Sequence, residues 1–480
     1  MRYHEDAVRV RTLTYRQLYE YACKFSGGLE QAGIRCGDRI AVFLPNCLEY
    51  PIVTYAALRI GAIPVLLNSG LKADKVFEYV RRADAKMLVT DDSLHSEVLS
   101  AKSAKCAYFT VAVGDQMWNT MLRADVPPKW ELEPSHPAYI LYTSGTTKEA
   151  KGAILSHGNI MSNIESVNRH TGMTSDDIAL CFLPLFHCFG QNFVMNALFN
   201  AEGTLILHRR FVLDEILASL RRHRVTMFFS IPPNYGSLLD LADISAFASV
   251  RYYFTAADKM PSDIVRAWQK KYGALIYEGW GLTELSPFAS YNHDTEYVFD
   301  TVGTPIEGVE IRVVDERSTP VRPGEMGQII VRGPNVFQGY LGDPEATAHA
   351  LRDGWFYTGD MGMLDARGYL SVSGRTNDTY KVSGFFVAPW DIEAHIFRRF
   401  GNRIKEVCVF DVPDKRRGKI SFAHVVAGPN APTEADILNE VSSGLAGYQR
   451  LGGVAFVDSI PKTPTGKIQR GVLRKQYEGA

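Results

Sequence analysis

The spacing of apolar residues switches between two periods along the first three hundred residues. Between residues 18 and 29, apolar side chains recur every three or four positions, which predicts one buried face of a helix. Thr14 and Gln17 form a capping pair before this helix, and Gly33 ends it. Short apolar runs such as residues 39–44 predict buried strands. Because strands and helices alternate, we expect parallel, doubly wound sheets covered by helices on both faces.

The same reasoning predicts further elements in order along the chain. Residues 91–137 are weakly patterned and are interpreted as an irregular connection, and Pro232-Pro233 is expected to stop the strand before it. Helices are predicted over 50–59, 73–82 and 211–222 and from about His157, and strands over 63–67, 87–90, 138–141, 178–182, 204–207, 225–229, 251–254 and 274–277.

The pattern changes near Thr301, where short alternating segments are separated by glycine and proline. Segments 309–314, 327–331 and 368–372 predict a small antiparallel or barrel-like unit. Beyond Arg375, a helix, several strands and a closing helix predict a compact α+β domain. We therefore expect an α/β protein with an N-terminal core over 1–375, whose β-rich subdomain covers about 301–374, and a C-terminal mobile domain over 376–480.

Composition excludes several classes of protein. The 480 residues carry a net charge of −1, so no overall field favours nucleic acid. The seven cysteines are scattered without Cys-x-x-Cys spacing, which is typical of free thiols in a reducing cytoplasm. No signal sequence follows Met1, and no run of about 18 apolar residues predicts a transmembrane segment. These features predict a cytoplasmic enzyme that is a monomer or a homodimer.

The stretch 142–152, Tyr-Thr-Ser-Gly-Thr-Thr-Lys-Glu-Ala-Lys-Gly, follows one of the predicted strands. Hydroxyls and backbone N–H groups can surround phosphate oxygens, and lysine adds countercharge. Its spacing is not the Gly-x-x-x-x-Gly-Lys-Ser/Thr pattern, and on composition alone a solvated loop remains the alternative. The candidate phosphate ligands are Thr143, Ser144, Gly145, Thr146, Thr147 and Lys151.

This stretch resembles the phosphate-binding signature of adenylate-forming enzymes, the superfamily of acyl-CoA synthetases, peptide-synthetase adenylation domains and luciferases. Further motifs extend the resemblance over nearly the whole chain. Lys148 stands where that family usually has glycine and Ala150 where it usually has proline. The resemblance implies use of ATP and Mg²⁺, with CoA or a carrier-protein phosphopantetheine as acceptor.

The second motif is Tyr277–Glu284, Tyr-Glu-Gly-Trp-Gly-Leu-Thr-Glu. Its glycines allow close approach of the backbone to a flat ligand, and Trp280, where the family usually has tyrosine, can stack on adenine. Thr283 can bind phosphate, and Glu284 can hold Mg²⁺, which prefers oxygen ligands. The alternative is a turn with a surface glutamate.

The segment Leu183–Gln191 resembles the family's aromatic motif beside the acyl pocket, and the resemblance makes His187 a gate or wall of the carboxylate site. Alone, such a histidine is usually a core residue. Relatives that adenylate α-amino acids carry an aspartate in this motif. The segment holds no acid, so a substrate without an α-amino group is expected.

Three motifs remain in the last quarter of the chain. Asp360, in Tyr-Thr-Gly-Asp, can accept hydrogen bonds from both ribose hydroxyls, and Arg375 resembles the second contact of that clamp. Asn377 occupies the hinge position, usually Asp or Lys in the family. By resemblance, Gly384 lies on the loop that lets the pantetheine arm pass, and Lys467 is the adenylation lysine, which stabilises the charge of the transition state.

The resemblance implies a ligase reaction in two steps. A carboxylate, already ionised at neutral pH, attacks ATP to give an acyl-adenylate and pyrophosphate, and a thiol then displaces AMP while the C-terminal domain rotates. An aliphatic, medium- or long-chain fatty acid is favoured, with an aryl acid as alternative. A luciferase-like oxygenase or a catalytically silent binding protein of the same fold also remains open. The apolar side chains that favour the fatty acid are Phe186, Phe189, Met195, Phe228 and Phe229.

Overall fold

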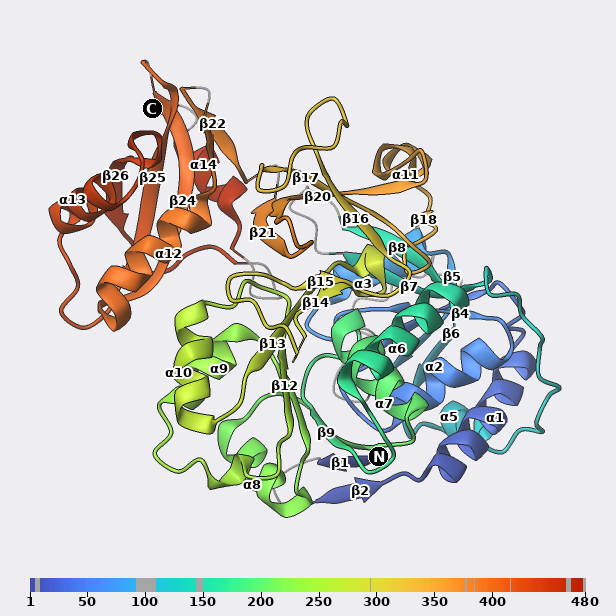
Figure 1. The fold of residues 1–480 in the computed structure, drawn as a ribbon. Helices are drawn as coiled ribbons and strands as arrows, with labels where there is room; N and C mark the ends of the chain where they lie inside the picture. Colours follow the sequence, from blue (N-terminus) through green and yellow to red (C-terminus); the bar gives the residue numbers. More distant parts are fainter. Residues whose placement is uncertain are drawn as a thin grey trace. The chain divides into compact units, whose positions relative to one another are not determined.

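The chain forms two compact units (Figure 1). The computed structural model describes residues 1–4, 9–91, 109–143, 150–293, 295–375, 378–383, 385–414, 416–462 and 468–477. The first unit comprises 1–143, 150–311 and 331–356, and the second includes 312–330 and the chain from Tyr357 onward. The sequence-based division at residue 375 stays a prediction.

The larger sheet of the first unit has nine strands in the described residues, in the order β15-β14-β13-β12-β11-β9-β10-β1-β2. Its central strands β13, β12, β11, β9 and β10 are parallel, as the alternation of helices and strands predicts. The strands are β1 (Arg2–His4), β2 (Val10–Thr12), β9 (Ile178–Cys181), β10 (Thr204–His208), β11 (Met227–Ser230), β12 (Tyr252–Thr255), β13 (Ile276–Gly281), β14 (Phe288–Tyr291) and β15 (Thr304–Pro305).

A second sheet of the same unit has seven described strands, in the order β18-β8-β7-β4-β3-β5-β6. Strands β7, β4, β3, β5 and β6 are parallel, whereas β8 is antiparallel to both β7 and β18. The strands are β3 (Arg39–Phe43), β4 (Ile63–Leu66), β5 (Ala85–Thr90), β6 (Phe109–Ala112), β7 (Pro137–Thr143), β8 (Lys151–Ser156) and β18 (Gly339–Tyr340).

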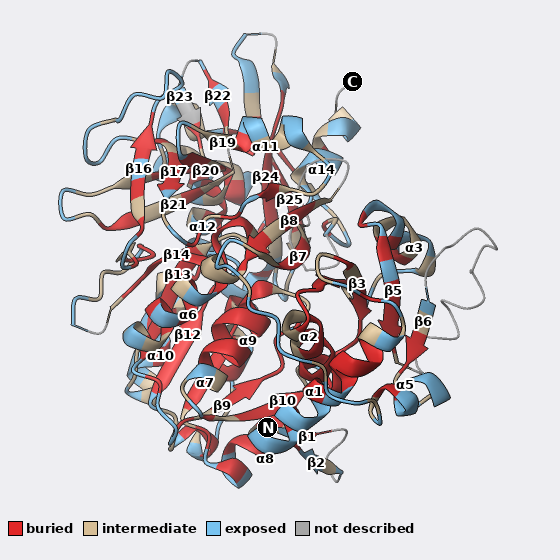
Figure 2. Cartoon of the chain, turned by 90° about the vertical axis from the view of Figure 1, so that its right-hand side faces the viewer, coloured by how far each residue is buried: buried red, intermediate tan, exposed pale blue. Residues whose placement is uncertain are grey.

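Helices cover the sheets of the first unit, and the strands between them are buried (Figure 2). The predicted capping pair is confirmed, because the Thr14 side chain accepts from the backbone N–H of Gln17 and the Gln17 side chain accepts from that of Thr14. Helices α9 and α10 lie on one side of β12 and β13, and α6 and α7 on the other (Figure 1). The helices are α1 (Tyr15–Gln31), α2 (Glu49–Arg59), α3 (Ala73–Arg82), α5 (Gln116–Met121), α6 (His157–Thr171), η1 (Phe189–Asn196, a π-helix), α7 (Ala197–Asn200), α8 (Leu213–His223), α9 (Pro232–Leu239), η2 (Ser245–Phe247), α10 (Ser262–Tyr272), η3 (Thr283–Leu285) and α11 (Pro344–Ala350).

One local prediction is wrong, and two features were missed. The stretch 91–137 is not wholly irregular, because it contributes β6, which extends the seven-stranded sheet, and α5. Pro232-Pro233 does not only stop a strand: these residues open α9, where a proline loses no helical hydrogen bond. Strand β8, between the phosphate-loop stretch and α6, was not predicted.

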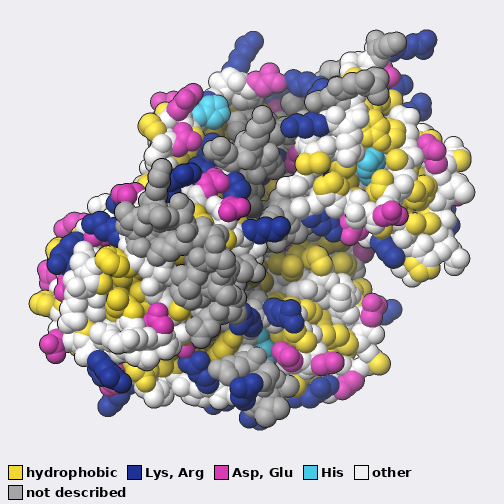
Figure 3. All heavy atoms as spheres, turned by 180° about the vertical axis from the view of Figure 1, so that it is seen from behind, with side chains coloured by type: hydrophobic (Ala, Val, Ile, Leu, Met, Phe, Trp, Pro, Cys, Tyr) yellow, Lys and Arg dark blue, Asp and Glu magenta, His cyan; other side chains and the backbone are white. Residues whose placement is uncertain are grey.

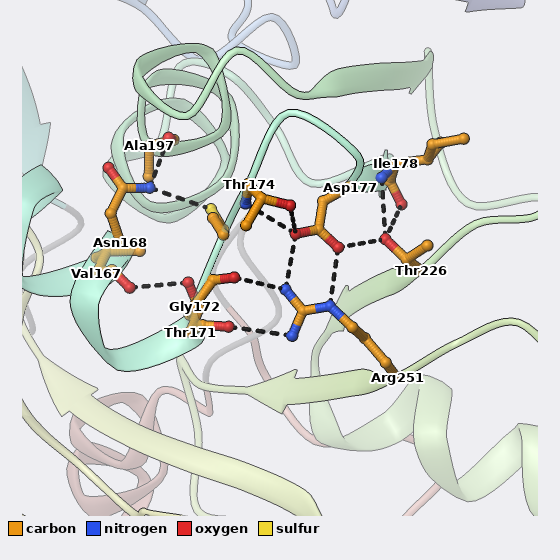
Figure 4. Close-up of polar contacts among 11 residues, drawn as sticks. Val167, Asn168, Thr171, Gly172, Thr174, Asp177, Ile178, Ala197, Thr226 and Arg251 are labelled. Carbon is orange, nitrogen blue, oxygen red and sulfur yellow. Dashed lines mark hydrogen bonds and ion pairs between the residues drawn. The ribbon is translucent and has the colours of Figure 1, made fainter.

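An ion pair between the buried Asp177 and the partly exposed Arg251 lies where central strands of the nine-stranded sheet begin (Figure 4). The Asp177 carboxylate accepts from Arg251 at 2.7 and 2.9 Å and from the Thr226 hydroxyl at 2.8 Å. Burial alone would raise the pKa of Asp177, but these hydrogen bonds and one from the Thr174 backbone lower it. Because these residues precede β9, β11 and β12, the contacts fix where the three strands begin.

The second unit holds the predicted β-rich segment and an α+β arrangement. Strand β20 is antiparallel to β21 and neighbours β17, which neighbours β16. In the C-terminal part, Arg470 donates to both carboxylate oxygens of Glu393 at 2.6 and 2.7 Å, joining α14 to α12. The short strand β19 (Leu351–Arg352) belongs to the first unit. The elements that lie wholly or mostly in the second unit are β16 (Glu310–Val314), β17 (Gly327–Arg332), β20 (Trp355–Leu364), β21 (Leu370–Arg375), β22 (Tyr380–Val382), β23 (Phe385–Val387), α12 (Pro389–Phe400), η4 (Gly401–Arg403), β24 (Ile404–Asp414), β25 (Gly418–Ala427), α13 (Glu434–Gly444), η5 (Gly447–Gln449), β26 (Leu451–Phe456) and α14 (Arg470–Tyr477).

The surface carries charges of both signs. On the face in Figure 3, Lys and Arg side chains are interspersed with Asp and Glu, as the net charge of −1 leads us to expect. Within the described ranges, no helix has the length and apolar character needed to span a membrane.

Candidate active site

The motif Tyr277–Glu284 forms the last strand of the parallel set and the turn that follows it. Strand β13 ends at Gly281, and the short helix η3 begins at Thr283. A Cβ on Gly279 would lie 2.5 Å from Phe254 Cζ, and one on Gly281 would lie 1.9 Å from the Pro287 carbonyl oxygen. Both glycines are therefore required by close packing, which fixes the direction in which the turn leaves the sheet.

Glu284 is held at two points by the segment that contains β18. Its side chain is buried, and Oε1 accepts a hydrogen bond of 2.8 Å from the Tyr340 hydroxyl. Its backbone carbonyl accepts from the Phe337 N–H at 2.9 Å. Glu284 is thus not the surface residue of the alternative interpretation, and its carboxylate has a fixed orientation.

Lys151 reaches the same place from the seven-stranded sheet. Its Nζ lies 5.0 Å from the centre of the Tyr340 ring, and its backbone pairs with Thr143 across β7 and β8. The structure therefore brings two predicted site residues, Lys151 and Glu284, to one tyrosine. The sequence motifs did not identify Tyr340, because its position depends on the pairing of β18 with β8.

The segment around His187 lies beside the same turn. Cys188 Sγ is 3.8 Å from the hydroxyl oxygen of Thr283. The imidazole of His187 is half-buried, and its Nδ1 accepts from the Phe189 N–H at 3.2 Å. The residue after His187 therefore contacts Thr283, while the role of His187 stays a prediction.

An aromatic cluster of the first unit begins in this segment, at Phe189. The Phe193 ring on η1 lies 4.4 Å from Phe254 and 4.7 Å from Phe288, and Phe189 lies 5.6 Å from Phe193. Phe229 also faces Phe193, at 5.6 Å. These rings are buried, and the cluster begins one residue after Cys188, which contacts Thr283.

Phe228 belongs to the other face of the sheet. Its ring packs against Tyr235 and Phe247, at 5.8 and 5.6 Å. Successive side chains of a strand point to opposite faces, so Phe228 and Phe229 cannot line one pocket. The predicted set of apolar pocket residues is accordingly divided between two faces.

Trp280 and Glu278 share the opposite face of β13 from the cluster, and both are buried. The Glu278 carboxylate accepts from the Met260 N–H at 2.9 Å. Burial raises the pKa of Glu278 to about 8, and Asp258 and Asp300 add to the increase, against the hydrogen bond and Lys259. Glu278 was not singled out from the sequence, although a buried carboxyl beside the predicted adenine contact is its distinguishing feature.

The second unit contains the pair predicted to bind ribose. Asp360 and Arg375 face each other across β20 and β21, with Arg375 Nε 2.8 Å from Asp360 Oδ1. The backbone N–H of Asp360 donates to the Thr358 hydroxyl at 3.0 Å. The two predicted clamp residues are thus in direct contact.

Several predicted residues lie outside the described residues. They are Ser144, Gly145, Thr146, Thr147, Lys148, Asn377, Gly384 and Lys467, and their roles stay predictions. In the described part of the chain, no group of three or more His, Cys, Asp or Glu side chains is arranged to hold a metal.

Known proteins are similar to this chain over almost its whole length. Residues 3–341 match the AMP-binding enzyme family and residues 401–467 its C-terminal domain. The chain is 32% identical to a feruloyl-CoA synthase of Amycolatopsis sp, over 99% of this chain and 96% of the relative. It is 30% identical to the long-chain-fatty-acid–CoA ligase of Escherichia coli O157:H7, over 97% and 90%.

Among solved structures, the fold is similar to that of ATP-bound MatB from Rhodopseudomonas palustris. The TM-score is 0.91 and the identity 31%, covering 97% of this chain and 93% of that one. The predicted fold class, a large layered α/β domain followed by a small C-terminal domain, is confirmed. The chain therefore belongs to the AMP-binding enzyme family and is an acid–thiol ligase of the acyl-CoA synthetase type.

Proposed function

We propose that this ligase joins a carboxylic acid to ATP as an acyl-adenylate and then transfers the acyl group to the thiol of CoA or of a carrier-protein phosphopantetheine. The observation that carries the proposal is the convergence of Lys151, Thr283 and Glu284 around Tyr340 and the His187 segment. A cation, a hydroxyl and a carboxylate at the end of a parallel strand are the groups that hold a magnesium nucleotide.

The first step requires charge neutralisation more than proton transfer. The attacking carboxylate is already ionised at neutral pH, so the chain needs no general base. Glu284 and Thr283 offer oxygen donors, which fit Mg²⁺ arriving with the nucleotide, and that ion supplies countercharge to the phosphates. Lys151 adds a positive charge on the phosphate side, and Lys467 is proposed to stabilise the charge that develops at the α-phosphate.

The second step exposes the adenylate to a thiol. We propose that Asp360 and Arg375 hold the ribose while the C-terminal domain rotates about Asn377. Lys467 then leaves, and the loop at Gly384 admits the pantetheine arm. The direct contact of Asp360 with Arg375 supports a shared role, because a ribose hydroxyl can bridge a carboxylate and a guanidinium.

The acid is proposed to be compact and apolar, with an aryl acid first. The rings of Phe189, Phe193, Phe254 and Phe288 pack closely in one cluster, and an aromatic ring packs against such a cluster edge to face. A feruloyl-CoA synthase among the relatives supports this choice. A medium- or long-chain fatty acid is the second candidate, supported by the similarity to a long-chain-fatty-acid–CoA ligase.

The test is acid-dependent exchange of pyrophosphate into ATP across a panel of aryl, short and long aliphatic acids, followed by thioester formation with CoA or carrier protein. We expect exchange with at least one acid and stronger exchange with aryl acids. If a folded sample gives no exchange with any acid of the panel, the proposed function is wrong. Stronger exchange with long-chain acids would select the second candidate.

The two-step scheme also predicts the behaviour of Lys467→Ala. Because the lysine is proposed to act only in adenylation, this variant should lose exchange while still forming thioester from supplied acyl-adenylate. The matched control is Lys475→Ala, which removes a lysine from α14 beyond the motif. Equal loss of both half-reactions in Lys467→Ala would contradict the division of roles.

A further inference from the structure

Tyr340 contacts residues from two separate motifs, Lys151 and Glu284. Its backbone pairs with Ala153 of β8, and its N–H donates to the Thr347 hydroxyl at 2.9 Å. Its ring packs against Phe337, with the centroids 4.8 Å apart. The position of Tyr340 is therefore set by the sheet, by a helix and by a neighbouring ring.

The two ends of the Tyr340 side chain meet different partners. The hydroxyl donates to Glu284 Oε1 at 2.8 Å, while Lys151 Nζ lies 5.0 Å from the centre of the ring. An ammonium above an aromatic face is attracted by the ring's negative face. The same side chain thus orients an anion through its hydroxyl and a cation through its ring.

We propose that Tyr340 is a positioning residue that aligns Glu284 for magnesium and Lys151 for the phosphates of ATP. The hydrogen bond at Oε1 restricts rotation of the carboxylate, so Oε2 is directed in advance. A carboxylate fixed in this way loses less entropy when it binds a cation, which favours binding before any chemistry begins. This inference rests on the proposed function, because it assumes that the site binds magnesium nucleotide.

The roles of hydroxyl and ring can be separated by two substitutions. Tyr340→Phe keeps the ring above which Lys151 lies and removes only the hydroxyl, whereas Tyr340→Leu removes both. The control is Tyr272→Phe, which deletes a tyrosine hydroxyl that donates at 2.8 Å to the Leu238 carbonyl, in α10 of the same unit. The control tests the effect of losing a hydroxyl as such.

The measurements are calorimetric binding of ATP with magnesium and with EDTA, and the magnesium concentration that half-saturates pyrophosphate exchange. In Tyr340→Phe we expect Mg·ATP binding to weaken about tenfold and the half-saturating magnesium concentration to rise by a similar factor, since a hydrogen bond to a charged group is lost. Binding of magnesium-free ATP should stay within about twofold of wild type. In Tyr340→Leu, binding should weaken both with and without magnesium.

Three outcomes would overturn the proposal. They are unchanged magnesium dependence in Tyr340→Phe, an equal loss in magnesium and in EDTA, and the same loss in the Tyr272→Phe control. If Tyr340→Phe is less stable, the comparison is repeated with Glu284→Gln and the double variant at a temperature at which all are folded. Additive losses of Mg·ATP binding would then contradict the inference, and non-additive losses would support it.

Failure of this inference can be told apart from failure of the proposed function. A wild-type protein that exchanges pyrophosphate, together with a Tyr340→Phe variant that behaves identically, contradicts only the role of Tyr340. A folded wild-type protein that neither exchanges pyrophosphate nor binds Mg·ATP contradicts the proposed function as well.

Discussion

Two glutamates six positions apart, Glu278 and Glu284, are buried to the same degree, and each is 7% exposed. Glu278 lies in β13, accepts a backbone N–H from Met260 and has acidic neighbours in Asp258 and Asp300. Glu284 lies in the turn after the strand and accepts from the Tyr340 hydroxyl, and Lys151 Nζ lies 5.0 Å from the centre of that ring. The two glutamates are therefore equally buried but have different neighbours: acidic side chains near Glu278, and a hydroxyl donor and a lysine near Glu284.

The difference shows that the neighbours of a carboxyl decide its use. With a pKa of about 8, Glu278 keeps its proton at neutral pH and behaves as a polar, uncharged group. Glu284 has a donor at one oxygen and the Lys151 ammonium near the ring of that donor. We infer that Glu278 supports the loop before α10, whereas Glu284 takes part in the reaction.

The strongest test of this comparison is the same substitution at both positions. Glu284→Gln keeps the shape but removes the charge, so adenylation measured as pyrophosphate exchange should fall about 10²- to 10³-fold. Glu278→Gln resembles the protonated side chain already present at pH 7 and should change exchange by less than about threefold. Equal losses in the two variants would contradict the distinction.

Sequence patterns predicted the elements whose periodicity is local. The helix over residues 73–82 is confirmed without change of bounds, because the apolar residues of its buried face all lie within the segment itself. The strand before Pro232-Pro233 ends as expected, but the helix that this pair begins was missed, since a proline pair that ends a strand looks the same in sequence as one that begins a helix. Strand β8 was not predicted, because it begins inside the polar stretch 142–152, which was interpreted as a loop.

In the candidate site, too, the sequence predicted residues that lie together in one motif but not residues that the fold brings together. Thr283 and Glu284 could be proposed from one continuous motif, and the structure places Lys151 near them. Tyr340 lies far along the chain and reaches Glu284 only because β18 pairs with β8. The raised pKa of Glu278 likewise depends on burial and on charges from separate segments, which no motif encodes.

A second test uses the pH dependence of stability. The pKa of Glu278 rises from 4.5 to about 8 on folding, so between these pH values the folded chain must keep a proton that the unfolded chain has released. Its contribution therefore lowers the free energy of unfolding progressively as the pH rises across that window. Above about pH 8 the loss is complete, and below pH 4.5 it is absent.

Glu278→Gln should remove this dependence. Compared with wild type, the variant should unfold at a higher temperature at pH 8 and at nearly the same temperature at pH 5. Thermal unfolding followed by circular dichroism checks the expectation, and Glu284→Gln is the matched control at an equally buried site. A wild type and a Glu278→Gln variant with parallel profiles from pH 5 to 8 would show that Glu278 is ionised in the folded chain.

The smallest expected effect concerns nucleotide binding at high pH. Glu278 shares a face of β13 with Trp280, the predicted adenine contact, and its partner Met260 ends a loop in which Ala257 has a φ of 77°. When Glu278 loses its proton above about pH 8, a negative charge appears beside the nucleotide side of the strand. We expect the dissociation constant of ATP to rise about threefold between pH 7 and 9 in wild type, since even a buried charge acts through an effective dielectric of about 20. In Glu278→Gln the constant should stay level, because no charge forms at this position. A wild-type constant that stays level as well would mean that the charge of Glu278 is not felt where ATP binds, and the division between a supporting and a reacting glutamate would then rest on Glu284 alone.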